Sequence, residues 1–109
     1  MSGAPRTEAL LNAADEIVQI GVRGMAGVAL QLVGTFTATV TFQATVDGET
    51  WVSFNMVPSN SATAVSTGTA AGAWSANCAG YESVRANVTA YTSGRITATL
   101  QAGEGAGRY

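Results

Sequence analysis

The feature that most constrains the fold is an uninterrupted alternation of apolar and polar residues over positions 35–46, TFTATVTFQATV. Every second residue is apolar or aromatic, and the residues between them are threonines and one glutamine. Successive side chains of a β-strand point to opposite faces of its sheet, whereas a helix would spread these apolar residues around its circumference. β-branched and aromatic residues also favour strands. The segment therefore predicts a strand with one buried face and one polar face.

Shorter segments of the same character lie on both sides of this strand. We expect further strands over residues 17–22, 27–33, 50–57, 63–67, 74–78, 81–91 and 95–101. The Asp47-Gly48 pair predicts a tight hairpin between the long strand and residues 50–57, because such turns favour residues that tolerate a positive φ. The alternation also predicts that Val52 and Ala90 point into the core.

About eight short strands separated by turn residues are typical of an all-β domain. Alternation on nearly every strand predicts two antiparallel sheets that share one core, and the eight-stranded form of this β-sandwich is the jelly roll. An immunoglobulin-like sandwich is the alternative, although the Cys…Trp…Cys spacing of its true members is absent. The fold expected is an antiparallel, jelly-roll-like β-sandwich.

The two ends of the chain differ in character from the middle. Residues 1–14 are expected to form an N-terminal arm, residues 15–101 the sandwich domain, and residues 102–109 a flexible glycine-rich tail. The arm contains Leu10 and Leu11, within a short Ala/Leu segment able to form one helical turn. Two interpretations of the arm remain open: a frayed terminus, or an extension whose leucines dock on a neighbouring subunit.

Residue types exclude most catalytic chemistry. The chain has 109 residues, seven acids, five arginines, no lysine and no histidine. It therefore lacks a Ser-His or Cys-His pair, a lysine for a Schiff base, and histidine ligands for zinc. The acids Asp15, Asp47, Glu49 and Glu82 lie at strand ends or turns, where carboxylates are ordinarily solvated. We expect no enzyme, no catalytic residue, no cofactor and no metal, with calcium at Asp47 and Glu49 as a minor alternative.

Charge and composition also limit the partners. The net charge is −2, and nucleic-acid binding needs a face rich in lysine and arginine. The single cysteine, Cys78, cannot form an internal disulfide and is expected to be a small buried residue. Neither a signal peptide nor a membrane-spanning apolar run is visible. We expect no nucleic acid and no membrane as partner, and synthesis as a soluble product. The low charge favours a surface that is covered in an assembly.

Residues 34–100 carry a resemblance to a known family. They contain GTFTATVTF, DGETW, a later stretch WSANCAGYESVR, and a closing YTSG turn before a threonine-rich strand. This pattern resembles a β-sandwich module of tailed-bacteriophage virion proteins, and it covers about two thirds of the chain. The matching residues are Gly34, Thr35, Phe36, Val40 to Phe42, Asp47, Gly48, Thr50, Trp51, Trp74, Ala79 to Tyr81, Val84, Arg85 and Tyr91 to Gly94.

The resemblance, together with the small size, implies a capsid decoration (cement) protein on the capsid surface of a virion, made in the bacterial host cytoplasm. Its implied partners are the major capsid protein and copies of itself, with a trimer favoured. The alternatives are a tail, baseplate or fibre component, or a carbohydrate-binding jelly-roll module.

Two groups of residues are candidates for contact with partners. The polar face of the long strand is a ladder of uncharged threonines, and outward arginines lie on the later strands. We expect an interface at Leu10, Leu11, Thr37, Thr39, Thr41, Arg85 and Arg95. Exposed aromatic residues suit carbohydrate, although they more often fill a core or anchor an interface. The candidates for such aromatic contact are Trp51, Trp74 and Tyr91.

Overall fold

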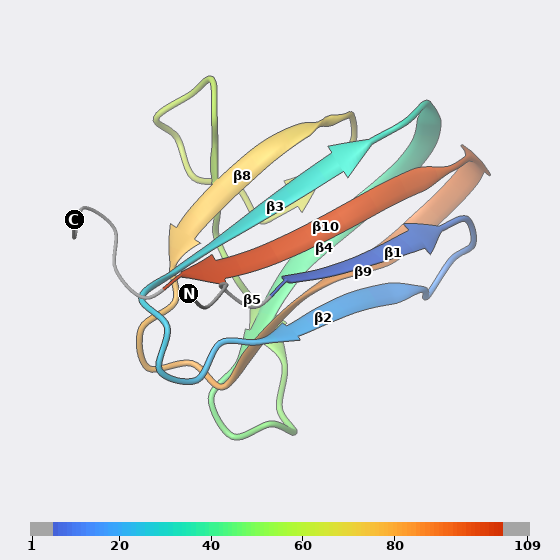
Figure 1. The fold of residues 1–109 in the computed structure, drawn as a ribbon. Helices are drawn as coiled ribbons and strands as arrows, with labels where there is room; N and C mark the ends of the chain where they lie inside the picture. The colour runs from blue at the N-terminus through green and yellow to red at the C-terminus, as the bar shows by residue number, and fades with distance from the viewer. Residues whose placement is uncertain (1–5, 104–109) are drawn as a thin grey trace.

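The computed structural model describes residues 6–103, which form two antiparallel sheets packed face to face as a sandwich (Figure 1). The first sheet has the order β1-β10-β3-β8-β6; the second has the order β2-β9-β4-β5, with β7 also paired to β4. The strands are β1 (Arg6–Leu11), β2 (Ile17–Gly21), β3 (Gly27–Val33), β4 (Phe36–Thr45), β5 (Val52–Ser53), β6 (Val57–Pro58), β7 (Thr67–Gly68), β8 (Gly72–Asn77), β9 (Ser83–Gly94) and β10 (Ile96–Gly103). None of the described residues belongs to a helix that is long and apolar enough to cross a membrane.

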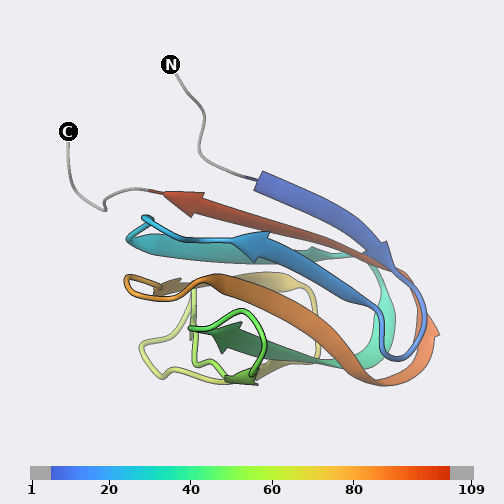
Figure 2. The same cartoon turned by 90° about the horizontal axis from the view of Figure 1, so that it is seen from below.

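The strand pairing is nested. β1 pairs with β10, β2 with β9, β3 with β8, and β4 with β5 and β7, so the first half of the chain runs antiparallel to the second half. The pairs β3–β10 and β4–β9 then join these ribbons into the two layers seen in Figure 2. This winding is the jelly-roll arrangement. The immunoglobulin-like alternative is wrong, because its first strand lies beside its second, whereas β1 lies beside β10.

The alternation over β4 becomes the centre of the core. Ala38, Val40, Phe42 and Ala44 are buried, while Thr37 is exposed on the opposite face. The Phe42 ring meets Trp74 of the first sheet at a centroid distance of 5.4 Å. The expectation of one buried and one polar face is confirmed for residues 37–44. It is wrong at the end of the segment, where β4 ends and Thr45 is buried while Val46 is 68% exposed.

β7 covers the Phe42–Trp74 pair, because the backbone of Gly68 packs against both rings. A Cβ added at Gly68 would lie 2.9 Å from Cζ2 of Trp74 and 3.3 Å from Cζ of Phe42. Such approaches are too short for a side chain without movement of the rings. The low-complexity stretch therefore contributes a glycine that the packing of Trp74 requires.

The N-terminal segment differs from the expected arm. Residues 6–11 form β1, a complete edge strand paired with β10 from Arg6–Gln101 to Leu11–Ile96. Leu11 is 1% exposed and belongs to the core, whereas Leu10 is 51% exposed on the outer face. Leu10 and Leu11 differ in burial because neighbouring side chains of a strand point to opposite faces of the sheet. The helical turn does not form, and the sandwich begins at Arg6 instead of residue 15.

At the other end, β10 continues to Gly103, so the domain includes the first two residues of the expected tail. Residues 1–5 of the arm and 104–109 of the tail lie outside the described residues.

The return strand expected over residues 50–57 is divided. β5 pairs with β4 in the second sheet, whereas β6 pairs with β8 in the first. The chain therefore crosses between sheets within this segment, and seven residues, 45–51, separate the Ala44–Val52 pair. The two-residue hairpin at Asp47-Gly48 is wrong for this reason. Val52 is 52% exposed, since β5 lies at the edge of its sheet and is only two residues long.

Two irregularities in the β4–β9 pairing change the face to which side chains near the end of β9 point. The register shifts between Thr37 and Ala38 and again between Thr39 and Val40. Each shift inserts an extra residue in β9, which interrupts its alternation. Ala90, expected to face the core, is therefore exposed.

Candidate functional site

The outer face of the second sheet is a polar surface with little charge. It is built from alternate residues of three neighbouring strands, whose other residues fill the core. We call it the threonine face; it comprises Gln19 of β2, Thr37, Thr39, Thr41 and Gln43 of β4, and Arg85, Asn87 and Thr89 of β9. Arginine is its one charged residue type. A sheet face with so little charge has little electrostatic protection against contact with other proteins.

Hydrogen bonds join the middle of this face across the strands. The hydroxyl oxygens of Thr41 and Thr89 lie 2.8 Å apart, and the Thr89 hydroxyl donates to the carbonyl of Thr39 at 3.4 Å. Thr89 contacts both Thr41 and Thr39 because it is the extra residue of β9 between the Thr39–Ala90 and Val40–Val88 pairs. Asn87 lies opposite Thr41, and its buried Oδ1 has no hydrogen-bond partner among the described residues. The threonines of β4 therefore belong to a hydrogen-bonded cluster that includes Thr89 of β9. The alternation of β4 alone did not indicate this cluster.

Arg85 is held in place at one end of the threonine face. Its Nε donates to Oε1 of Gln43 at 2.7 Å, on the directly opposite position of β4. Its Cζ lies 4.2 Å from the centroid of the half-buried Trp51 ring, in a cation–π arrangement. Arg85 and Trp51 were predicted as separate contact residues, and the structure brings them into contact.

Arg95 lies apart from this group. It occupies the turn between β9 and β10, and its amide donates to the carbonyl of Thr35 at 3.2 Å. Its side chain is exposed at the end of the sandwich. Leu10 lies on the outer face of the first sheet, and Leu11 is in the core. The predicted interface residues are therefore distributed over several surfaces, and only Thr37, Thr39, Thr41 and Arg85 share one.

The three candidate aromatic residues do not form a common platform. Trp74 is 8% exposed and packs in the core against Phe42. Tyr91 is half-buried, and its hydroxyl donates to the carbonyl of Gly94 at 2.8 Å. Trp51 lies beneath Arg85. A flat, shared surface for stacking a sugar ring is absent from this set.

The Asp47 loop is organised around one carboxylate oxygen. Oδ1 of Asp47 accepts the amides of Glu49 and Thr50, each at 2.8 Å, and the Thr45 hydroxyl at 3.0 Å. These hydrogen bonds, first those from the Thr50 and Glu49 amides, lower the pKa of Asp47 to about 2. The side chain stabilises the turn, as in an Asx turn, through its Oδ1 oxygen.

Because the folded pKa of Asp47 is depressed, its contribution to loop stability is complete above its ordinary pKa of 3.8 and is lost as the pH falls toward about 2. We expect the Asp47 carboxyl resonance to titrate near pH 2 in NMR spectra. The amide shifts of Glu49 and Thr50 should follow the same curve, because both amides donate to this carboxylate. A midpoint near 3.8 would show that these hydrogen bonds do not persist in solution.

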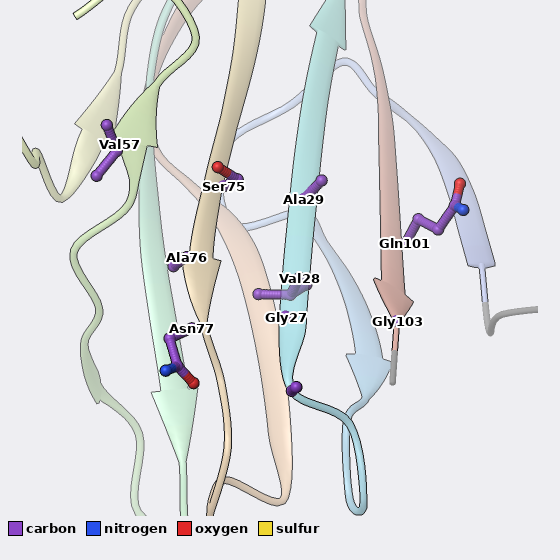
Figure 3. A pocket seen from close by; sticks show the side chains of 10 residues that line it. Gly27, Val28, Ala29, Val57, Ser75, Ala76, Asn77, Gln101 and Gly103 are labelled. Carbon is purple, nitrogen blue, oxygen red and sulfur yellow. The ribbon is translucent and has the colours of Figure 1, made fainter. Parts of the chain in front are cut away.

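A hollow of about 950 Å³ lies on the outer face of the first sheet. Figure 3 shows the small side chains of its central strands, with larger side chains around them. It is lined by Ala26, Gly27, Val28, Ala29, Val57, Ser75, Ala76, Asn77, Gln101 and Gly103, none of them charged. The sequence pattern does not indicate this hollow, because only the pairing of β3 with β8 and β10 brings these small residues together.

Groups with chemical reactivity are dispersed. Within residues 6–103 no three His, Cys, Asp or Glu side chains lie close enough to hold a metal ion. Cys78 is fully buried, and burial raises the pKa of its thiol. A raised thiol pKa and a closed environment oppose nucleophilic reactivity.

The strand order and the two packed sheets define a jelly-roll domain whose outer faces carry few charged residues. No protein-family model matches the chain, and no curated protein matches it in sequence. Two solved structures share the fold. The SPBc2 prophage-derived protein YomS has a TM-score of 0.68 at 13% identity, covering 89% of this chain and 94% of YomS. The PBSX exported protein XepA has a TM-score of 0.71 at 20% identity, covering 89% of this chain. The chain spans 38% of the length of XepA.

Proposed function

We propose that the chain is a non-enzymatic structural protein of a tailed-bacteriophage virion, which decorates the capsid surface and stabilises it by binding between capsid subunits. The observation that carries this proposal is the whole-length similarity to a single jelly roll of prophage origin, covering 94% of YomS. The second structural neighbour, XepA, is named for the prophage PBSX. The proposed partners are the major capsid protein and further copies of this chain.

The threonine face supports a role in contact. Its centre is ordered by the Thr41–Thr89 hydrogen bond, and its end by Arg85 on Trp51. An ordered surface loses little side-chain entropy when a partner covers it. A protein that binds only the assembled shell stabilises that shell by mass action. Stabilisation therefore requires a complementary surface and no reactive group.

A tail, baseplate or fibre location is the alternative within the same class, since the jelly roll is shared by proteins with many roles. The carbohydrate-binding alternative has less support, because Trp74 is in the core and the remaining aromatic residues are held by intramolecular contacts.

The experiment is co-sedimentation of the purified chain with separated heads and tails of the phage that encodes it. We expect retention on heads. Thr39→Lys places a charge on the threonine face and should reduce retention on the order of tenfold, because an unpaired charge is desolvated on binding. Thr99→Lys is the matched control, at a half-buried position on the outer face of the first sheet. Retention on tails alone would favour the alternative, and equal losses for the two variants would contradict the role of the threonine face.

A further inference from the structure

The edge strand β2 differs from the other sheet edges. β1 carries Arg6 and Glu8 at exposed positions, β5 and β6 have two residues each, and β6 ends in Pro58. Charges, proline and short length are the usual protections of a sheet edge against pairing. β2 has five residues, IVQIG, without charge or proline. Figure 2 views the molecule from this side and shows no other strand in front of β2.

The hydrogen bonds to β9 determine which backbone groups of β2 remain free. The Val88 amide donates to the Glu16 carbonyl, and the Val22 amide donates to the Glu82 carbonyl, each at 2.9 Å. Residues of an antiparallel strand alternate between bonding to one neighbour and facing away from it. Since the even-numbered residues face β9, the amides and carbonyls of Ile17, Gln19 and Gly21 point toward the open edge.

We propose that β2 pairs antiparallel with β2 of a second copy around a twofold axis at Gln19, joining the two second sheets into one continuous sheet. In this register Gln19 lies opposite the second copy's Gln19, and Ile17 lies opposite the second copy's Gly21. All three outward residues of each strand then exchange both backbone hydrogen bonds. Shifting the register by two residues in either direction would leave at least one of them outside the β2–β2 pairing.

The side chains of β2 are complementary in the same register. Ile17 is 42% exposed and meets a glycine, and a Cβ added at Gly21 would have only the Glu82 carbonyl, at 4.0 Å, nearby. Asp15 and Arg23 lie in the turns beyond the two ends of β2, outside this pairing, and the contact of Ile17 with Gly21 is made twice, once on each side of the axis. Such self-complementarity is the requirement for an isologous twofold contact. Arg23 has one weak intramolecular ion pair, at 3.7 Å from Glu82.

The pairing does not depend on the virion location proposed above, and it extends the threonine face across both copies. Sedimentation equilibrium of the full chain should show a monomer–dimer equilibrium. Amide exchange at Gln19 should slow as the protein concentration rises, while exchange at exposed loop amides such as that of Asn60 should not change.

Gln19 lies opposite Gln19 of the second copy only if the twofold axis passes through this position. A substitution here therefore places two identical new side chains opposite each other, which allows a specific test. Gln19→Lys and Gln19→Glu should each weaken dimerisation by on the order of tenfold, because like charges lie directly opposite. An equimolar mixture of the two variants should form heterodimers at least as well as the wild type. Gln31→Lys, an equally exposed change on the central strand β3, should leave the dimer unchanged. Circular dichroism confirms that each variant is folded.

A wild-type chain that is monomeric or trimeric at all concentrations would overturn the proposal. So would variants at residue 19 that dimerise as the wild type does, or a mixture that remains monomeric. Loss of head binding with intact dimers would contradict the proposed function alone.

Discussion

Replacing Phe42 with alanine should lower the free energy of unfolding by about 3–5 kcal/mol, the cost typical of removing a buried aromatic side chain. Phe42 is fully buried at the centre of β4, and its ring packs at 58° against Trp74 of the opposite sheet. The cavity would open beneath Gly68, where no side chain is present to fill it. Small domains have only about 5–15 kcal/mol of stability in total, so the loss is a large part of it.

Urea denaturation followed by tryptophan fluorescence measures this change, because Trp74 reports on the affected site. Thr41→Ala is the control on the same strand: it removes the hydroxyl that lies 2.8 Å from Thr89 on the outer face, without opening the core. We expect that loss to stay near 1 kcal/mol or below. Similar midpoints for Phe42→Ala and Thr41→Ala would show that β4 does not form the centre of the core.

The second large effect concerns the N-terminal segment. Leu11→Ala should destabilise the domain by about 2–5 kcal/mol, whereas the neighbouring Leu10→Ala should change stability by less than about 0.5 kcal/mol. Leu11 is 1% exposed and pairs with Ile96 at the end of β1, while Leu10 is 51% exposed. The two substitutions remove the same atoms from adjacent positions, so they differ only in the face of β1 that they affect.

Thermal and urea unfolding of the two variants measure this difference. Equal effects from Leu10→Ala and Leu11→Ala would mean that residues 6–11 do not pair with β10 in solution. The pairing of β1 with β10 also determines the expected result of truncation. Deleting the first 14 residues would remove β1 and expose the edge of β10, so it should destabilise the sandwich itself and not merely weaken contact with a partner.

Local alternation determined much of the fold. The residues of β3 and β4 that face the core were predictable because the period of two in a strand depends only on the residues themselves. The positions of β2, β3, β4, β8, β9 and β10 and of several turns followed in the same way, and so did the prediction of a jelly roll. β1 was missed, the strand expected over residues 50–57 is divided, and the strand expected over residues 63–67 is reduced to the Met56–Val65 bridge and the start of β7. The absence of histidine and lysine is a property of composition alone, and it is sufficient to exclude several catalytic mechanisms.

The places where the sequence misled are those where a distant partner decides the outcome. Leu11 became a core residue because β10 offers a free edge to β1, and a pair of neighbouring leucines does not indicate which of them is buried. Ala90 turned outward because β9 carries irregularities in its pairing with β4. The residues after Asp47 left the expected hairpin because β5 pairs with β4 whereas β6 pairs with β8 of the other sheet.

The alternation of threonines with apolar residues in β4 was sufficient to predict a strand with a polar outer face. It gave no information about which residues of other segments share that face. Only the tertiary structure placed Thr89 against Thr41 and Arg85 over Trp51, because those contacts join residues separated by more than thirty positions in the chain. Among residues 6–103 it also left β2 as an edge strand whose Ile17, Gln19 and Gly21 backbone groups face away from β9. Periodicity is a local property of a sequence, whereas a sheet edge and a surface exist only once the strands have been ordered in space.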